Sequence, residues 1–267
     1  MAITSGDTYI GAAKQIVPFT KTASTTTVAN TRFSVFDKAG NPGAGTLALT
    51  TALTGVVPDD TVAGYPTINA FGGGATGYLS RVQFASSVVQ RIEIWDRLFG
   101  INVSLAALAT TTLSGASSYL GRVPGGANAH GTRLFAEFTT AAAAASTITV
   151  TYTNSAGTAG RSTGASASVS GFTVNRLLEL PLQAGDVGVN SIQTVVVGGT
   201  AGAGAVNIIV LRPLWTARVP VANGGDIHGP DKTGMPVVYD TSALYVTCIP
   251  DSTSTGVPDL NIEISNA

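Results

Sequence analysis

Alternating hydrophobic and polar residues are the main regular pattern of this chain, and they are densest in residues 77–100, GYLSRVQFASSVVQRIEIWDRLFG. In an extended strand, successive side chains of residues 78–85 point to opposite faces, so that every second residue shares a face. Ile92 and Ile94 alternate with polar or aromatic neighbours in the same way. The pattern predicts two strands with a turn at residues 86–87.

A helix over residues 88–99 is the competing interpretation. Four apolar residues have the spacing of one helix face: Val88, Ile92, Trp95 and Phe99. Gly100 would be a suitable helix end. Val and Ile nevertheless supply four of the seven residues 88–94, and β-branched side chains favour strands. We therefore expect a strand here.

Further short runs of alternation follow, separated by turns rich in Gly, Pro, Ser and Asn. The clearest is residues 147–153, where Ile148, Val150 and Tyr152 share one face and four threonines share the other. This pattern predicts a sheet with one buried face and one wet, threonine-lined face. Other expected strands are residues 32–37, 132–138, 191–197, 205–211, 243–249 and 260–264.

The spacing of these strands also suggests how they are connected. We expect residues 132–138 to pair with residues 147–153, and residues 191–197 to form a hairpin with residues 205–211 around a glycine-rich turn. The sequence has no repeat of fixed period, which argues against propellers and solenoids. Many short strands separated by turns predict an all-β fold, a β-sandwich of the jelly-roll type.

The expected domain organisation is an irregular N-terminal arm, residues 1–30, followed by one β-sandwich domain, residues 31–267. The arm is expected because residues 20–27, TKTASTTT, offer little apolar surface to bury. Two interpretations stay open at this point. The arm is either a loosely ordered tail or a segment that docks on a neighbouring subunit, since termini are ordered only where something holds them.

Charge is scarce, and its balance excludes some partners. Only 11% of the 267 residues are charged, with 14 basic and 15 acidic side chains, against about 25% in typical globular proteins. Nothing here favours binding to nucleic acid or to an anionic membrane. Two long uncharged stretches, residues 98–121 and 187–211, are too interrupted by polar residues and glycine to be membrane spans. A surface of Thr, Ser, Asn and Gly suits a protein held in a larger assembly.

The cellular compartment is suggested by two further features. The N-terminal segment lacks a basic start followed by an apolar core, so we expect no signal peptide. Cys248 is the single cysteine and lies in an expected strand, LYVTCI, where a buried and inert thiol is the natural interpretation. We expect the protein to be made and folded in a cytoplasm.

His228 is the strongest candidate for chemistry, because Asp226 and Asp231 flank it in a glycine-rich loop. A metal ligand or a general base would need more partners than this cluster supplies, since zinc sites take three or four ligands. A turn stabilised by Asp side chains is the simpler interpretation.

The remaining candidates are weaker. His130 has no acidic neighbour, and the adjacent pair Asp59-Asp60 is too small for a cation site. Residues 72–77, GGGATG, are not followed by Lys and Ser or Thr, so they are not a P-loop. We expect no catalytic, cofactor-binding or metal-binding residues and no enzymatic activity.

One resemblance to a known group is carried by short motifs. Gly77-Tyr78-Leu79-Ser80-Arg81, then Ile94-Trp95-Asp96-Arg97-Leu98-Phe99 and a threonine-rich segment, and later Leu178-Glu179-Leu180-Pro181 before a glycine-rich stretch, are similar to structural virion proteins of tailed bacteriophages. The resemblance covers residues 30–215 in organisation and only these motifs at residue level. Within them we expect Trp95, Asp96, Arg97 and Phe99 to be core and turn residues.

The resemblance implies a component of the virion, above all a capsid decoration (cement) protein. Such a protein would bind the major capsid protein and copies of itself, as a homotrimer. The alternative is a tail or fibre component that binds a host receptor or glycan. That alternative would use aromatic side chains exposed in loops, such as Tyr65, Tyr119 or Trp215. The resemblance implies no catalytic residue and no cofactor.

Overall fold

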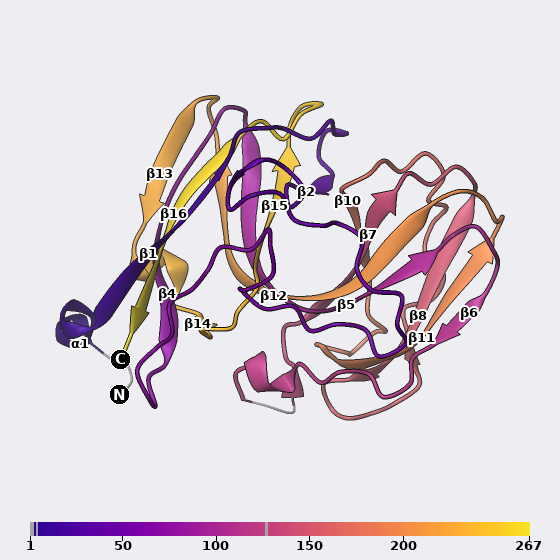
Figure 1. Cartoon of the computed structure of the whole chain (residues 1–267), viewed down its shortest axis with the longest axis horizontal. Helices are drawn as coiled ribbons and strands as arrows, with labels where there is room; N and C mark the ends of the chain where they lie inside the picture. The colour runs from indigo at the N-terminus through magenta and orange to yellow at the C-terminus, as the bar shows by residue number, and fades with distance from the viewer. Residues whose placement is uncertain (1–2, 4, 126–127) are drawn as a thin grey trace. The chain divides into compact units, whose positions relative to one another are not determined.

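The computed structural model describes residues 3, 5–125 and 128–267 (Figure 1). The chain is all-β with several sheets, as the sequence predicts for a sandwich of the jelly-roll type. It divides into two compact units. Unit 1 contains the chain up to Thr46, then Asp59–Asp96 and Leu214–Ala267, and unit 2 contains Leu47–Pro58 and Arg97–Pro213. No change of composition along the expected single domain, residues 31–267, marks this division.

Unit 1 is built on a six-stranded antiparallel sheet. Its strands follow the order β13-β4-β16-β1-β3, with β14 also paired to β4, and β13, β4, β16 and β1 lie side by side in Figure 1. The elements are α1 (Gly6–Gly11), β1 (Ala13–Lys21), β2 (Arg32–Ser34), β3 (Gly40–Asn41), β4 (Gly77–Ser86), β13 (Gly224–His228), α2 (Pro230–Thr233), β14 (Val237–Val238), β15 (Leu244–Pro250) and β16 (Pro258–Asn266). In the same unit, β15 pairs with β2.

Two long strands, β5 (Gln90–Ser104) and β12 (Ala205–Val219), contribute residues to both units. Strand β5 decides the question over residues 88–99 in favour of a strand, and the turn before it lies close to the expected residues 86–87. Residues Gln90–Asp96 pair with Pro250–Leu244 of β15. Almost every side chain of β5 is buried, on both faces, and the buried set includes the charged residues Glu93, Asp96 and Arg97.

The expectation of an irregular arm over residues 1–30 is wrong for Ala13–Lys21. These residues form β1, which pairs with β16 from Ala13 opposite Asn266 to Thr20 opposite Asp259. Val17 and Phe19 are buried in the core of unit 1. Residues 22–30 lie outside strands, although Thr27 still donates its backbone N–H to the carbonyl of Thr253.

Lys21 ends β1 with its ammonium group inside the protein. Its Nζ donates to the carbonyl oxygens of Lys38 at 3.1 Å and Pro42 at 2.8 Å. Burial lowers the pKa of Lys21 to about 8, opposed by the negative charge of Asp37. The side chain therefore fixes the turn of residues 38–43 to the first strand.

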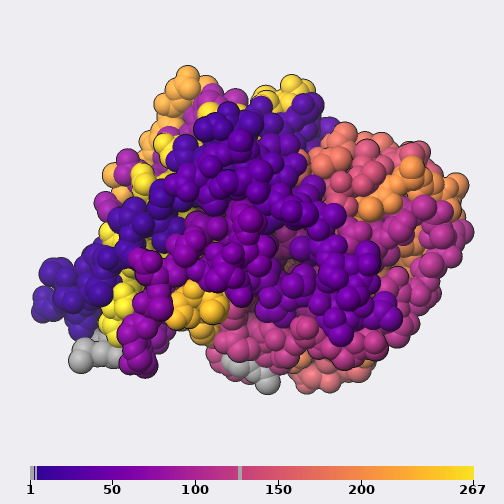
Figure 2. Space-filling model, viewed as in Figure 1, coloured from indigo at the N-terminus to yellow at the C-terminus, as the bar shows by residue number. Residues whose placement is uncertain are grey.

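Helix α1 is the part of the N-terminus that still resembles an arm. None of its residues is buried, and Ile10 is 74% exposed. Figure 2 shows its atoms, in indigo, projecting from the rest of unit 1. The helix is held by a capping box between Ser5 and Thr8, and by the hydroxyl of Tyr9, which donates to Glu263 at 2.8 Å.

Unit 2 contains two sets of paired strands around its own core. One is a four-stranded sheet in the order β6-β11-β8-β9, and in the other β7 pairs with both β12 and β10. The elements are β6 (Thr110–Thr112), η1 (Leu120–Arg122), β7 (Arg133–Thr140), β8 (Ser146–Asn154), β9 (Arg161–Ser162), β10 (Arg176–Leu180) and β11 (Val189–Gly199).

The predicted strands of unit 2 exist, but their predicted partners are wrong. Strand β7 pairs with β12 rather than with β8, and β11 pairs with β8 rather than with β12. Residues 141–145 and 200–204, which we expected to close hairpins, instead carry the chain from one set of strands to the other. The consecutive strands β7 and β8, and likewise β11 and β12, therefore lie in different sheets, as in sandwich folds.

A buried ion pair lies among the strands of unit 2. Arg97 of β5 donates from Nη2 to Oε2 of Glu137 on β7 at 2.8 Å, and both side chains are 0% exposed. Asn207 of β12 donates to the same carboxylate oxygen at 2.8 Å. The neighbouring residue Asp96 accepts a hydrogen bond from the Ser242 hydroxyl at 2.8 Å.

We predict that Arg97→Met destabilises the protein by about 3–5 kcal/mol, because it leaves Glu137 as a buried carboxylate without its cation. Urea denaturation followed by circular dichroism measures the change. The matched control is Arg218→Met, whose partner Asp251 lies at 3.0 Å in an exposed pair. An exposed pair contributes about 1 kcal/mol or less, so equal losses in the two variants would contradict the prediction.

Candidate functional site

The predicted candidate His228 lies at the end of β13 rather than in a loop. Strand β13 pairs with β4, where His228 stands opposite Val82. Trp215 of β12 donates from Nε1 to His228 Nδ1 at 3.1 Å. The rings of His228 and Phe84 meet edge to face, with centroids 5.0 Å apart. The imidazole is thus one member of a small aromatic cluster.

The partners of His228 determine its protonation. An indole N–H can only donate, so Nδ1 must accept and the proton of the neutral imidazole sits on Nε2. Burial lowers the pKa of His228, and the positive charge of Lys232 lowers it further, while Asp226 and Asp231 oppose both. Nε2 lies 3.9 Å from Oδ2 of Asp226, too far for a hydrogen bond.

Asp226 is engaged in the local backbone structure. It accepts from the N–H of Ile227 at 2.8 Å, and this bond, followed by the charge of Lys232, lowers its pKa. Over the described ranges 3, 5–125 and 128–267, no three His, Cys, Asp or Glu side chains gather closely enough to hold a metal ion. The cluster has the geometry of a structural contact.

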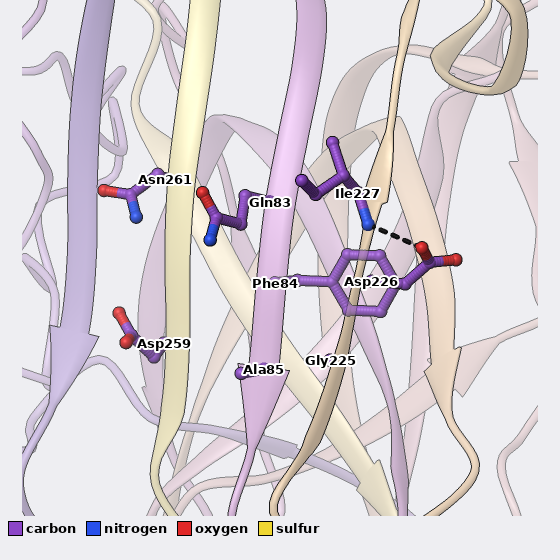
Figure 3. A pocket seen from close by; sticks show the side chains of 8 residues that line it. All are labelled: Gln83, Phe84, Ala85, Gly225, Asp226, Ile227, Asp259 and Asn261. Atoms are coloured by element: carbon purple, nitrogen blue, oxygen red, sulfur yellow. Dashed lines mark hydrogen bonds between the residues drawn. The ribbon is translucent and has the colours of Figure 1, made fainter.

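A shallow groove lies beside this cluster, on the outer face of the sheet of unit 1. It has a volume of about 440 Å³. Figure 3 shows the amides of Gln83 on β4 and Asn261 on β16 next to each other, with Asp259 below them and Ile227 on β13. The groove offers amide and carboxylate groups that can bind polar ligands. No sequence motif points to Gln83, Asp259 or Asn261, because they come together only through the pairing of β4 with β16.

Other sequence candidates are placed individually. Cys248 is buried in β15, as predicted, and burial raises the pKa of its thiol. His130 is exposed and forms an isolated bridge with Gly188. Asp59 accepts from Thr61, whereas Asp60 is buried and accepts from the backbone of Ile68, so each stabilises its own loop.

The glycine-rich residues 72–77 line a surface depression together with Phe71 and residues 238–240. In the described part of the chain, no helix is long and apolar enough to cross a membrane.

The aromatic residues assigned to a glycan-binding role are not exposed. Tyr65, Tyr119 and Trp215 are all buried. Tyr119 donates to the carbonyl of Val189 at 2.6 Å, and Tyr65 stacks near Phe36. The expectation that these side chains are exposed in loops is therefore wrong, because all three rings are packed inside the protein.

The motif residues 95–99 are core residues, as expected, but they lie within β5 and not in a turn. Trp95 donates from Nε1 to the hydroxyl of Thr247 at 2.9 Å, and Phe99 packs near Tyr119.

We predict that His228 titrates below its ordinary pKa of 6.5. The neutral ring accepts the Trp215 N–H, so the folded state takes up a proton less readily than the unfolded state. The contribution of His228 to stability is therefore present above pH 6.5 and declines as the pH falls below it. NMR titration of the imidazole protons measures the midpoint, and His130→Gln shows which of the two histidine signals belongs to His228.

Trp215→Phe removes the donor while keeping an aromatic ring, so it should move this midpoint upward. A midpoint for His228 at or above 6.5 in the unchanged protein would contradict the assignment.

Comparison with known proteins shows little similarity. No protein-family model matches the sequence, and no curated protein matches it. Among solved structures, the infectious bursal disease virus VP2 subviral particle is 12% identical, over 96% of this chain and 80% of that chain, with a TM-score of 0.19. The infectious bursal disease virus Gx strain structure is 11% identical over the same shares, with a TM-score of 0.20. Scores this low establish neither a common fold nor a common function.

Proposed function

We propose that this chain is a structural component of a tailed-phage virion, a capsid decoration protein that binds the major capsid protein and copies of itself as a homotrimer. The proposal assigns it no catalytic activity and no cofactor. It would be made in the host cytoplasm and would act in the particle.

The observation that carries the proposal is the burial of several of the few charged side chains. Several ionised side chains are turned inward. Arg97 and Glu137 are fully buried, the Arg32–Glu93 pair at 2.6 Å is 14% and 8% exposed, and Asp186 is 3% exposed beside Arg161. The outer face of the β6-β11-β8-β9 sheet carries threonine and serine hydroxyl groups, and the outer face of the unit 1 sheet carries amides beside a few charged side chains. Such faces can lie against neighbours without like-charge repulsion, which suits a protein packed on a shell.

The sheets supply the rigidity that such a role needs. β1 pairs with β16, so the two ends of the chain are joined in one sheet. The only cysteine, Cys248, is buried. The fold is therefore stabilised without disulfides, as suits a protein assembled in a cytoplasm.

A tail or fibre component that binds a host glycan is the second candidate. The groove lined by Gln83, Asp259 and Asn261 supports it, because amides and carboxylates can bind sugar hydroxyls. The burial of Tyr65, Tyr119 and Trp215 weakens it. We therefore prefer the decoration role.

We predict that the protein is present in purified particles in a copy number comparable with that of the major capsid protein. Quantitative mass spectrometry of the particles, with labelled standard peptides for both proteins, measures this ratio. A handful of copies per particle would favour the tail or fibre candidate instead, and absence from the particle would overturn the virion proposal.

We also predict that the N-terminal segment ending at Gly11 contributes to docking on the shell or on a neighbouring subunit. Deleting residues 1–11 leaves β1 and its pairing with β16 intact, whereas deleting residues 1–30 would remove a strand. The shortened chain loses the Tyr9–Glu263 hydrogen bond, but it should still unfold in a single cooperative transition and should bind stripped particles more weakly. Ile10→Ser provides a point variant in the full-length chain, because Ile10 is 74% exposed in a helix none of whose residues is buried. Equal particle occupancy by both variants and the unchanged chain would rule out a docking arm.

A further inference from the structure

A pocket lined by two arginines lies in unit 1 where β15 ends. It has a volume of about 340 Å³ and is formed by Asn30, Arg91 of β5, Arg218 of β12, Ile249 and Asp251. Arg218 donates from Nη2 to Oδ2 of Asp251 at 3.0 Å, in a pair whose side chains are 64% and 42% exposed. Two guanidinium groups thus share one carboxylate, and one positive charge of the pocket is left unmatched.

Arg91 carries this unmatched charge. Its side chain is exposed, and of the 14 basic side chains it is the one that has no hydrogen bond, ion pair or ring contact among the described residues. Other arginines are engaged, as Arg32 is with Glu93 at 2.6 Å and Arg176 is over the ring of Phe172. In a chain with so few charges, an unengaged arginine beside a pocket marks a position for an anion.

The pocket favours a carboxylate among the anions. A guanidinium presents its N–H donors in a planar fork that matches the two oxygens of a carboxylate. One negative charge balances the excess charge of the pocket, whereas a phosphate dianion would bring a second negative charge close to Asp251. Ile249, which stands opposite Arg91 in the β15–β5 ladder, offers an apolar wall for the methylene group of an acidic side chain.

An unengaged acidic side chain lies on the projecting helix α1. Asp7 is in the first turn of this helix, is exposed, and has no such contact with another described residue. Figure 2 shows the helix standing out from the rest of unit 1. Asp240 is also unengaged among the described residues, but it lines the surface depression formed with residues 71–77. Asp7 is therefore the better placed of the two to enter the pocket of another molecule.

The helix and the pocket lie at opposite ends of the sheet of unit 1 (Figure 1). Helix α1 directly precedes Ala13, which stands opposite Asn266 at the end of β16. The pocket lies near the start of β16, beside the turn between β4 and β5, where Asp251 donates its N–H to the carbonyl of Val89. The nine residues of β16 span about 27 Å. Asp7 therefore does not reach the pocket of its own chain.

We propose that Asp7 of one copy of the chain binds between Arg91 and Arg218 of the next copy, an inference that rests on the proposed function. The two contacting surfaces differ and lie at opposite ends of unit 1, so the contact is head-to-tail. Such a contact closes into a ring when the rotation between neighbouring copies allows it, and a trimer would be a ring of three. Each copy then inserts one helix α1 and receives another, and only opposite charges meet.

Charge reversal tests this contact, because Asp7 and Arg91 are both exposed. Sedimentation velocity of the purified chain over a range of concentrations measures association. The unchanged chain should form species heavier than the 26.9 kDa monomer. Arg91→Glu and Asp7→Arg should each need about tenfold more protein to associate, since each brings like charges together. The double variant, with both reversals, should associate as the unchanged chain does.

Asp240→Arg is the matched control, since it makes the same charge change at another unengaged aspartate. Alone it should leave association unchanged, and combined with Arg91→Glu it should not restore association. Circular dichroism and the unfolding midpoint establish that each variant is folded.

The proposal is overturned if the unchanged chain is a monomer at its highest soluble concentration, if the folded single variants associate normally, or if the double variant does not recover. If Arg91→Glu lowers particle occupancy without changing self-association, the carboxylate belongs to the capsid protein, and the contact between copies is likewise overturned. Sedimentation uses purified protein without particles, so its outcome is independent of the copy number in the virion that tests the proposed function.

Discussion

A guanidinium and a carboxylate enclosed together, Arg97 with Glu137, impose the strongest single constraint on unit 2. Enclosing two charges costs several kcal/mol for each ion, which is offset only when all their hydrogen-bonding groups are satisfied. Asn207 supplies a further hydrogen bond to the carboxylate. Its Nδ2 donates to Glu137 and to the carbonyl of Leu47, and its Oδ1 accepts from the backbone N–H of Leu49 and from Asn102. One carboxylate thereby fixes strands β5, β7 and β12 and the loop that follows Thr46.

This network specifies the register of the strands more than it adds net stability. Asn207 stands opposite Glu137 in the β12–β7 ladder, and Leu177 of β10 stands opposite the same residue. A slip of one residue would turn Glu137 to the other face of the sheet and separate it from Arg97. Arg122 reinforces the arrangement by donating to the carbonyls of Pro58 and Arg97. The mismatched registers are excluded because each leaves a buried charge without its partner.

Alternation of apolar and polar residues can predict that a strand exists and which of its faces is buried, but it does not show which other strand it pairs with. In β8 it correctly identified one buried and one wet face, because period two directly reflects the pleat. Alternation could not identify the partner of a strand, since β7 and β8 are consecutive strands with a short connection yet lie in different sheets. β1 was missed because residues 16–19 are apolar in succession. Only Val17 and Phe19 among them are buried, while Ile16 is half exposed.

The candidate site shows the same limit. The tautomer of His228 is set by Trp215, which lies thirteen residues earlier on another strand. No local sequence motif indicates this contact. Gln83 and Asn261 were predictable as outward-facing residues of their strands. Their adjacency was not, because it arises from the pairing of β4 with β16, which lie far apart in the sequence.

The placement of charge connects the fold to the proposed assembly. A chain with 11% charged residues that buries several of them must remain soluble through hydroxyl and amide groups. These groups hydrogen-bond to water, but they do not repel an identical chain as a surface of one charge would. A free monomer gains little from this arrangement, because a higher net charge would protect it better against association. In a symmetric shell every copy has permanent neighbours, and there the lack of repulsion becomes an advantage.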